Sequence, residues 1–130
     1  MNSTSLSVDG GMEITVRYES SVAAGVWFRV RRMTLRQRIQ LLEDLYPLYT
    51  EAEFLKGGAT EAERLMAQVK TLKLQEILLR WGVESVGGLV VNGRELTARE
   101  LSENAPEELA AEMVQRVQEA AGLTEKQEKN

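Results

Sequence analysis

The stretch Thr34–Gly58, TLRQRIQLLEDLYPLYTEAEFLKGG, and the stretch Thr60–Gly82, TEAERLMAQVKTLKLQEILLRWG, decide the fold of this chain. Each begins with a threonine suited to capping a helix, and Thr60–Glu63 has the spacing of a complete capping box. Each ends in glycine, the residue that most often follows a helix. The sequence therefore predicts two long consecutive helices with the turn between them at Gly57 and Gly58.

The first predicted helix is apolar around about half of its circumference. One row consists of Leu35, Ile39, Leu42, Tyr46 and Tyr49, and an adjacent row consists of Leu41, Leu45 and Leu48. Such an arc is wide enough for two packing layers. Pro47 lies in the polar arc and predicts that the helix kinks or ends there.

The second predicted helix also carries two apolar rows. The first consists of Leu65, Val69, Leu72 and Leu79, with Glu76 interrupting it, and the second of Leu74, Ile77, Leu78 and Trp81. We interpret Glu76 as an ion-paired residue or one at the edge of an interface. The apolar surface of both helices exceeds what a small β-hairpin covers, which favours a partner protein or a second copy.

Shorter elements flank these helices. Residues 12–18 and 26–31 each alternate apolar and polar side chains, as two antiparallel strands do. A small β unit is predicted at 83–96, where Asn92-Gly93 signals a tight hairpin. A short helix after Thr97 and an amphipathic helix starting at Pro106 and ending at Gly122 follow.

The predicted fold is α+β: an N-terminal β-hairpin, two long helices, a small β unit and a C-terminal amphipathic helix. Residues 12–122 form one domain, and residues 1–11 and 123–130 are expected to be flexible tails.

Composition excludes several classes of function. The chain has no histidine and no cysteine, which removes the commonest general base, imidazole metal sites and disulfides. We therefore expect no enzyme activity, no cofactor and no metal. The net charge of −4 does not favour nucleic acid or an anionic membrane as the main partner. No signal peptide or membrane span is recognisable, so a cytoplasmic location is expected.

Two sets of residues are candidates for partner binding. Trp27, Arg29, Arg31 and Arg32 belong to a basic stretch, Arg29–Arg38, that contains no acidic residue. It is interpreted either as a site for phosphate or an acidic partner, or as a solvated face. The second set is apolar: Leu41, Leu45, Leu74, Leu78 and Trp81. These residues serve equally well as contacts for a helical partner and as core.

The order of several short motifs resembles that of small proteins encoded in prophage tail regions. The motifs are Phe28-Arg29-Val30-Arg31-Arg32-Met33-Thr34, Phe54-Leu55-Lys56-Gly57-Gly58, Leu79-Arg80-Trp81-Gly82 and Pro106-Glu107-Glu108-Leu109, with Gly122-Leu123-Thr124-Glu125 and Glu128-Lys129-Asn130 at the end. Over about residues 27–130 the pattern resembles phage tail assembly chaperones. That resemblance implies a non-enzymatic protein of the host cytoplasm that shields an apolar helical tape measure protein.

Two alternatives stay open. The chain is also compatible with an oligomeric structural component of a phage tail, because its helices offer apolar surface for self-association. A nucleic-acid-associated regulatory module would use Trp27 and the Arg29–Arg38 cluster.

Overall fold

The computed structural model describes residues 14–123. The predicted tail 1–11, and the predicted tail 123–130 apart from Leu123, lie outside these residues. The elements in order are β1 (Thr15–Glu19), β2 (Trp27–Arg31), α1 (Leu35–Lys56), α2 (Glu61–Gly82), β3 (Val83–Gly87), β4 (Val90–Val91), β5 (Arg94–Glu95), a 3₁₀ turn (Ala98–Glu100), α3 (Leu101–Asn104) and α4 (Glu107–Ala120). The predicted α+β class and order of elements are confirmed.

The three longer strands form one antiparallel sheet in the order β1-β2-β3. Val16 pairs with Val30 and Tyr18 with Phe28, so the predicted N-terminal hairpin is present. β3 pairs with the other edge of β2, where Phe28 lies opposite Val86. The small β unit predicted at 83–96 is present, and its first strand, β3, also extends the N-terminal sheet.

Only β4 and β5 form the separate hairpin that Asn92-Gly93 predicts. Both turn residues have positive φ, 53° at Asn92 and 79° at Gly93, as a tight hairpin turn requires. Leu96, which follows β5, is buried and its backbone N–H bonds to the carbonyl of Leu89. The small hairpin is thereby anchored to the core by residues on both sides.

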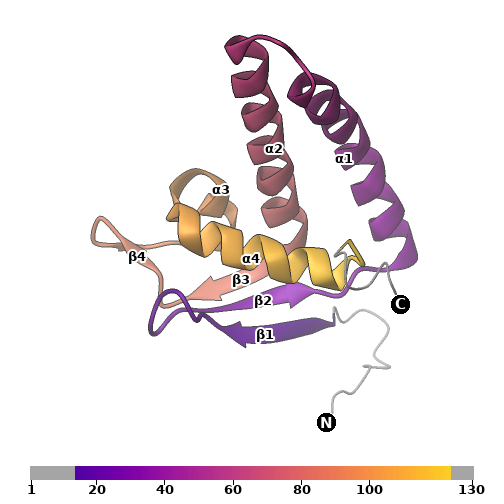
Figure 1. The fold of residues 1–130 in the computed structure, drawn as a ribbon. Coiled ribbons are helices and arrows are strands. Elements are labelled where there is room, and N and C mark those ends of the chain that lie inside the picture. Colours follow the sequence, from indigo (N-terminus) through magenta and orange to yellow (C-terminus); the bar gives the residue numbers. More distant parts are fainter. Residues whose placement is uncertain (1–13, 124–130) are drawn as a thin grey trace.

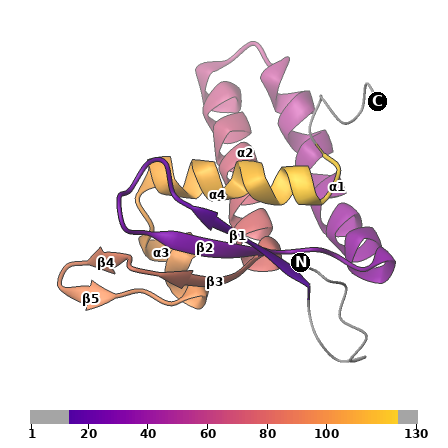
Figure 2. The ribbon, with the colours of Figure 1, turned by 90° about the horizontal axis from the view of Figure 1, so that it is seen from below.

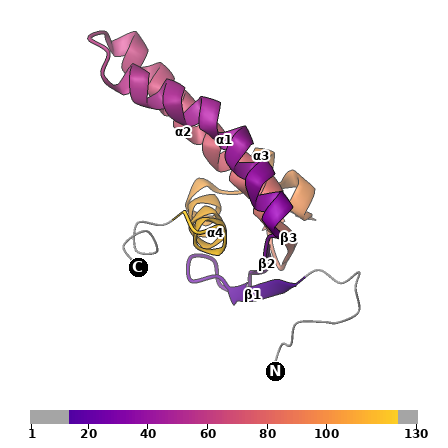
Figure 3. The same cartoon turned by 90° about the vertical axis from the view of Figure 1, so that its right-hand side faces the viewer.

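Helix α4 lies across one face of the sheet, as Figures 2 and 3 show. The buried residues between them include Phe28 and Val30 of β2 and Leu109, Met113 and Val117 of α4. The alternation in β2 places Phe28 and Val30 on this face and Trp27, Arg29 and Arg31 on the other. α4 begins at Glu107, one residue later than predicted, with Pro106 as its cap.

Helices α1 and α2 form an antiparallel hairpin that projects away from the sheet and α4 (Figures 1 and 3). Complete capping boxes at Thr34–Gln37 and Thr60–Glu63 begin the two helices. α1 continues through Pro47 to Lys56, so the helix does not end at the proline. Where the hairpin joins the sheet and α4, Leu41, Leu45, Leu78 and Leu79 belong to the main core. Farther out, the buried positions are Ala52 and Ala67.

Candidate functional site

The first apolar row of α1 lies on the surface. Its members, which we call the outer row of α1, are Leu35, Ile39, Leu42, Tyr46 and Tyr49. Leu35 is 78% exposed, Tyr46 69% and Tyr49 59%. The adjacent row faces inward, with Leu41 and Leu45 buried. Within the described part of the chain, α1 therefore uses one of its two apolar rows for the core and leaves the other partly to largely exposed.

Helix α2 repeats this arrangement. Its outer row consists of Leu65, Val69 and Leu72, which are 56%, 40% and 51% exposed. Leu79, predicted to continue the same row, is instead buried near the sheet. Glu76 forms an ion pair of 3.6 Å with Arg80 on its own helix, and its side chain is part-exposed. The outer row thus ends where the hairpin meets the body of the protein.

Three adjoining hollows that share lining residues lie in the angle between this hairpin and α4, and together we call them the hairpin groove. One hollow of about 260 Å³ lies between Tyr49, Ala52 and Leu74 of the hairpin and Val114 and Gln118 of α4. A second, of about 360 Å³, shares Tyr49, Leu74 and Gln118 with it. This second hollow is lined by Leu42, Leu45, Tyr46, Tyr49, Thr50, Leu74, Leu78, Gln118 and Leu123. Most of its wall is apolar, and three of the five α1 residues in it belong to the outer row.

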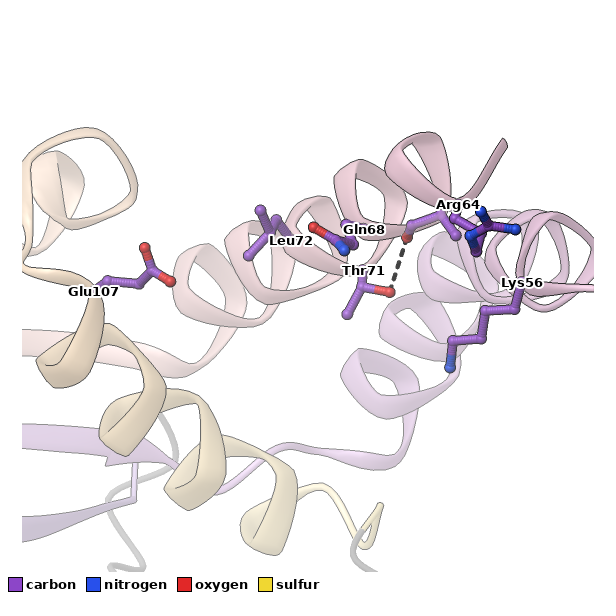
Figure 4. A pocket seen from close by; sticks show the side chains of 7 residues that line it. Lys56, Arg64, Gln68, Thr71, Leu72 and Glu107 are labelled. Atoms are coloured by element: carbon purple, nitrogen blue, oxygen red, sulfur yellow. Dashed lines mark hydrogen bonds between the residues drawn. The ribbon is translucent and has the colours of Figure 1, made fainter. Parts of the chain in front are cut away.

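Toward the end of the hairpin the groove widens into a hollow of about 510 Å³ (Figure 4). Lys56 and Arg64 lie at its hairpin end, and Glu107 at the start of α4 lies at its other end. Between them the wall includes Leu72 and Thr71, whose hydroxyl donates a 3.0 Å hydrogen bond to the carbonyl of Ala67. This internal bond occupies the donor of the hydroxyl, and the Gln68 side chain lines the same part of the wall.

Polar contacts between the two helices of the hairpin come from residues that do not line these hollows. Lys70 of α2 forms an ion pair of 3.3 Å with Glu51 of α1. The indole N–H of Trp81 donates a 3.2 Å hydrogen bond to Asp44. The hairpin therefore links its helices on the side away from the groove, and the side that borders the groove mixes apolar residues with polar ones such as Lys56 and Gln75.

The predicted apolar contact residues are divided between core and groove. Leu41 is fully buried in the core. Leu45, Leu74 and Leu78 line the groove floor, although Leu45 and Leu78 are themselves buried. Trp81 is half-buried against the core and bound to Asp44. The exposed apolar surface comes mainly from the neighbouring outer rows, which periodicity identifies but does not distinguish from the inner rows.

Of the predicted basic set, Trp27, Arg29 and Arg31 lie on the face of the sheet opposite α4. The Arg17 guanidinium lies 4.4 Å from the centre of the Trp27 ring, and that of Arg29 lies 5.8 Å from it. A side chain added at Gly87 would collide with the same indole. Both sides of the Trp27 ring are thus already in contact with protein, which leaves little open ring surface for stacking a base.

The other basic residues do not join this cluster closely. Arg31 donates a 3.3 Å hydrogen bond to the carbonyl of Trp81, at the end of α2. Arg32 is exposed beyond β2, and Arg36 and Arg38 are exposed on α1. The basic stretch is therefore distributed over a sheet face, a connection and a helix.

The carboxylates with displaced pKa values serve the fold. Backbone hydrogen bonds from Thr60 and Thr97 lower the pKa of Glu63 and Glu100, both of which complete capping boxes. Burial acts to raise the pKa of Glu112, but hydrogen bonds from Ser20 and Ser21 outweigh it, and the net pKa lies below its usual value. All three side chains are thus held in the ionised form that accepts hydrogen bonds.

Comparison with known proteins supplies no relative: no protein-family model, no curated protein and no solved structure matches this chain. Within residues 14–123 no group of acidic side chains is placed to hold a metal ion. In the same residues, no helix combines the length and apolar character needed to cross a bilayer. The hairpin groove is the feature that the following proposal uses.

Proposed function

We propose that this chain is a non-catalytic binding protein that holds an apolar helical segment of another protein in its hairpin groove. The observation that carries the proposal is a set of exposed apolar side chains in the groove wall, Tyr46 and Tyr49 of α1 and Leu72 of α2, beside the part-buried Leu74. An amphipathic helix binds such a groove through apolar side chains on one face. The exposed surface of Leu72, Tyr46 and Tyr49 is then removed from water on binding.

The resemblance to phage tail assembly chaperones supports a more specific form of this proposal. In that form the partner is a long, apolar, helix-rich protein of the tape measure type, and this chain keeps it in solution until assembly. The acidic balance of the chain, −4, supports the solubility of such a complex. The absence of histidine and cysteine supports a role without catalysis.

The nucleic-acid alternative receives less support from the arrangement of its candidate residues. Trp27 lies between Arg17 and Gly87, so its ring is occupied by contacts within the protein. Single-stranded nucleic acid binding usually depends on aromatic faces that are open to stacking. The groove therefore carries the proposal.

Co-expression with the nearest encoded long, apolar, helix-rich protein tests the function. Size-exclusion chromatography with light scattering then measures whether the two proteins co-elute and in what ratio. We expect the long protein to become soluble and to co-elute with the wild-type chain. If it stays insoluble while this chain elutes without it, the chaperone proposal is wrong.

Two matched variants locate the binding surface. Leu72→Glu places a charge in the groove wall, and burying that charge against an apolar helix should weaken binding at least about tenfold. Val90→Glu introduces the same charge at a 60% exposed apolar residue of β4, away from the groove, and should bind like wild type. Equal loss in both variants would place the binding surface elsewhere or indicate a general effect of charge.

A further inference from the structure

The outer row of α1 has the spacing of a coiled-coil seam. Its five residues follow one another at intervals of four, three, four and three: Leu35, Ile39, Leu42, Tyr46 and Tyr49. A seam of this period fits along a second helix with the same period. Within residues 14–123 the row is covered only in part: Leu35 and Tyr46 are 78% and 69% exposed, and Leu42 at its centre is 38% exposed.

Charge along α1 is divided in a way that suits self-pairing. The first part of the helix carries Arg36 and Arg38, and the later part carries Glu43, Asp44, Glu51 and Glu53, the last of which is ion-paired with the terminal Lys56. When two copies of α1 lie antiparallel, the basic part of each faces the acidic part of the other. The helix is thus complementary to itself, as a two-fold interface requires.

One register of the antiparallel pair satisfies both the seam and the charges. In this register Ile39 of one copy lies opposite Leu42 of the second copy. Leu35 then lies opposite Tyr46 of the second copy. The two-fold axis passes between positions 40 and 41. Arg36 and Glu43 each follow a seam leucine by one residue, so they share a flank. In antiparallel helices the same flanks meet, and Arg36 of each copy then lies beside Glu43 of the other.

The competing register, with Leu42 opposite Leu42, is less favourable. It brings Glu43 beside Glu43 of the second copy, and like charges across an interface repel. Neither Arg36 nor Glu43 forms an ion pair with another residue in the described part of the chain, while their neighbours Asp44 and Glu51 are bound to Trp81 and Lys70. An ion pair between Arg36 and Glu43 of the two copies would therefore favour the first register over the second.

We propose that two copies of this chain associate about a two-fold axis through antiparallel α1 helices, with Arg36 of each copy beside Glu43 of the other. The contact involves four turns of one helix, so the association is reversible and depends on protein concentration. Leu42, Tyr46 and Tyr49 also form one wall of the hairpin groove. The second copy and a groove-bound helix therefore compete for this wall, and the self-paired form protects it while no partner is present.

Sedimentation equilibrium of the full chain over a range of concentrations tests the pairing. We expect the mass to rise with concentration from that of one copy to that of two. Leu42→Asp should weaken association at least about tenfold, because it buries two charges at the centre of the seam. The Leu42 side chain is partly exposed, 38%, and circular dichroism checks that the variant remains folded. Val90→Asp, on the distant β4 strand, is the matched control and should associate like wild type.

A charge exchange tests the register. Arg36→Glu and Glu43→Arg should each weaken association by about threefold to tenfold, since each places like charges at both symmetry-related contacts. The double variant Arg36→Glu/Glu43→Arg should regain most of the lost affinity.

A chain that stays monomeric at every concentration, or a dimer that Leu42→Asp leaves unchanged, would overturn the pairing. A double variant weaker than either single one would overturn the register. Co-elution with the long helical protein is measured separately, so failure here leaves the proposed function standing.

Discussion

Glu112 connects the last helix to the loop between the first two strands. Its carboxylate accepts hydrogen bonds from the Ser20 hydroxyl at 2.6 Å and from the Ser21 N–H and hydroxyl at 2.7 and 2.8 Å. Its spacing in the sequence favours an i,i+4 pair with Arg116. Arg116 instead bonds to Glu119 at 3.2 Å and lies over the Tyr18 ring. Arg116 still attracts the Glu112 carboxylate electrostatically, but the hydrogen-bond partners of Glu112 lie about ninety residues away along the chain, where spacing cannot find them.

Replacing this carboxylate should destabilise the fold. We expect Glu112→Gln to lower the free energy of unfolding by about 2 kcal/mol at neutral pH, because charged acceptors make the stronger hydrogen bonds. The pKa of Glu112 is lowered in the folded protein. Its contribution is therefore complete above its ordinary pKa of 4.5 and is lost as the pH falls through the lower, folded value.

Urea unfolding of both proteins between neutral pH and pH 3 measures this contribution. The difference between wild type and Glu112→Gln should be constant above about pH 5 and should shrink in more acidic solution. Glu108→Gln, on the exposed side of the same helix, should change stability by less than about 0.5 kcal/mol. A difference that persists unchanged at pH 3 would show that the hydrogen bonds to the ionised carboxylate are not its cause.

At the scale of elements, local signals in the sequence predicted most boundaries. Thr34 and Thr60 cap the two long helices, and Asn92-Gly93 makes the tight hairpin, as their chemistry requires. Pro47 was the weaker signal: packing of Leu41 and Leu45 on one side and Ala52 on the other carries α1 through it. The pairing of β3 with β2 was not predicted, because strand partners depend on which residues the fold brings together.

The crossing of α2 and α4 depends on a residue without a side chain. Gly82, the last residue of α2, packs so closely on Val117 of α4 that an added Cβ would collide with both of its methyl groups. We expect Gly82→Ala to lower the free energy of unfolding by about 1–3 kcal/mol, although alanine is the better helix former. Thermal unfolding followed by circular dichroism measures the loss.

Gly57→Ala is the matched control for this crossing. Gly57 has φ −81°, which alanine adopts without strain, and the nearest atom to its added Cβ would be the Phe54 carbonyl oxygen at 3.7 Å. This variant should be neutral or more stable by up to about 1 kcal/mol. Equal losses in the two variants would mean that the packing on Val117 is not the limiting contact.

The whole molecule consists of a well-packed body and a projecting hairpin. The body contains the sheet, α4 and the inner ends of α1 and α2, with Phe28, Leu41 and Met113 fully buried. In the outer part of the hairpin the buried residues are the small Ala52 and Ala67. The sequence alone could not place this division, because both apolar rows of each helix are equally suited to core and to surface. The same ambiguity applies to the predicted contact residues, of which Leu41, Leu45 and Leu78 are buried while the neighbouring outer rows are exposed.

This division predicts uneven stability along the two long helices. Local opening costs least where few apolar contacts are lost, so amides at the end of α1 and the start of α2 should exchange hydrogen sooner than those of β2 and α4. Hydrogen exchange followed by mass spectrometry measures this on the full chain, and Leu42→Asp provides a version in which the proposed self-pairing is removed. We expect exchange in residues 50–68 to be at least about tenfold faster than in α4 in both proteins.

In the proposed complex, a helix bound in the groove contacts Tyr49, Lys56 and Leu72 together. Adding the long helical protein to the wild-type chain should therefore slow exchange in this same segment. Uniform protection along both helices in the unbound chain would mean that the hairpin opens only with the whole fold, and that its exposed rows belong to a rigid surface formed before any partner arrives.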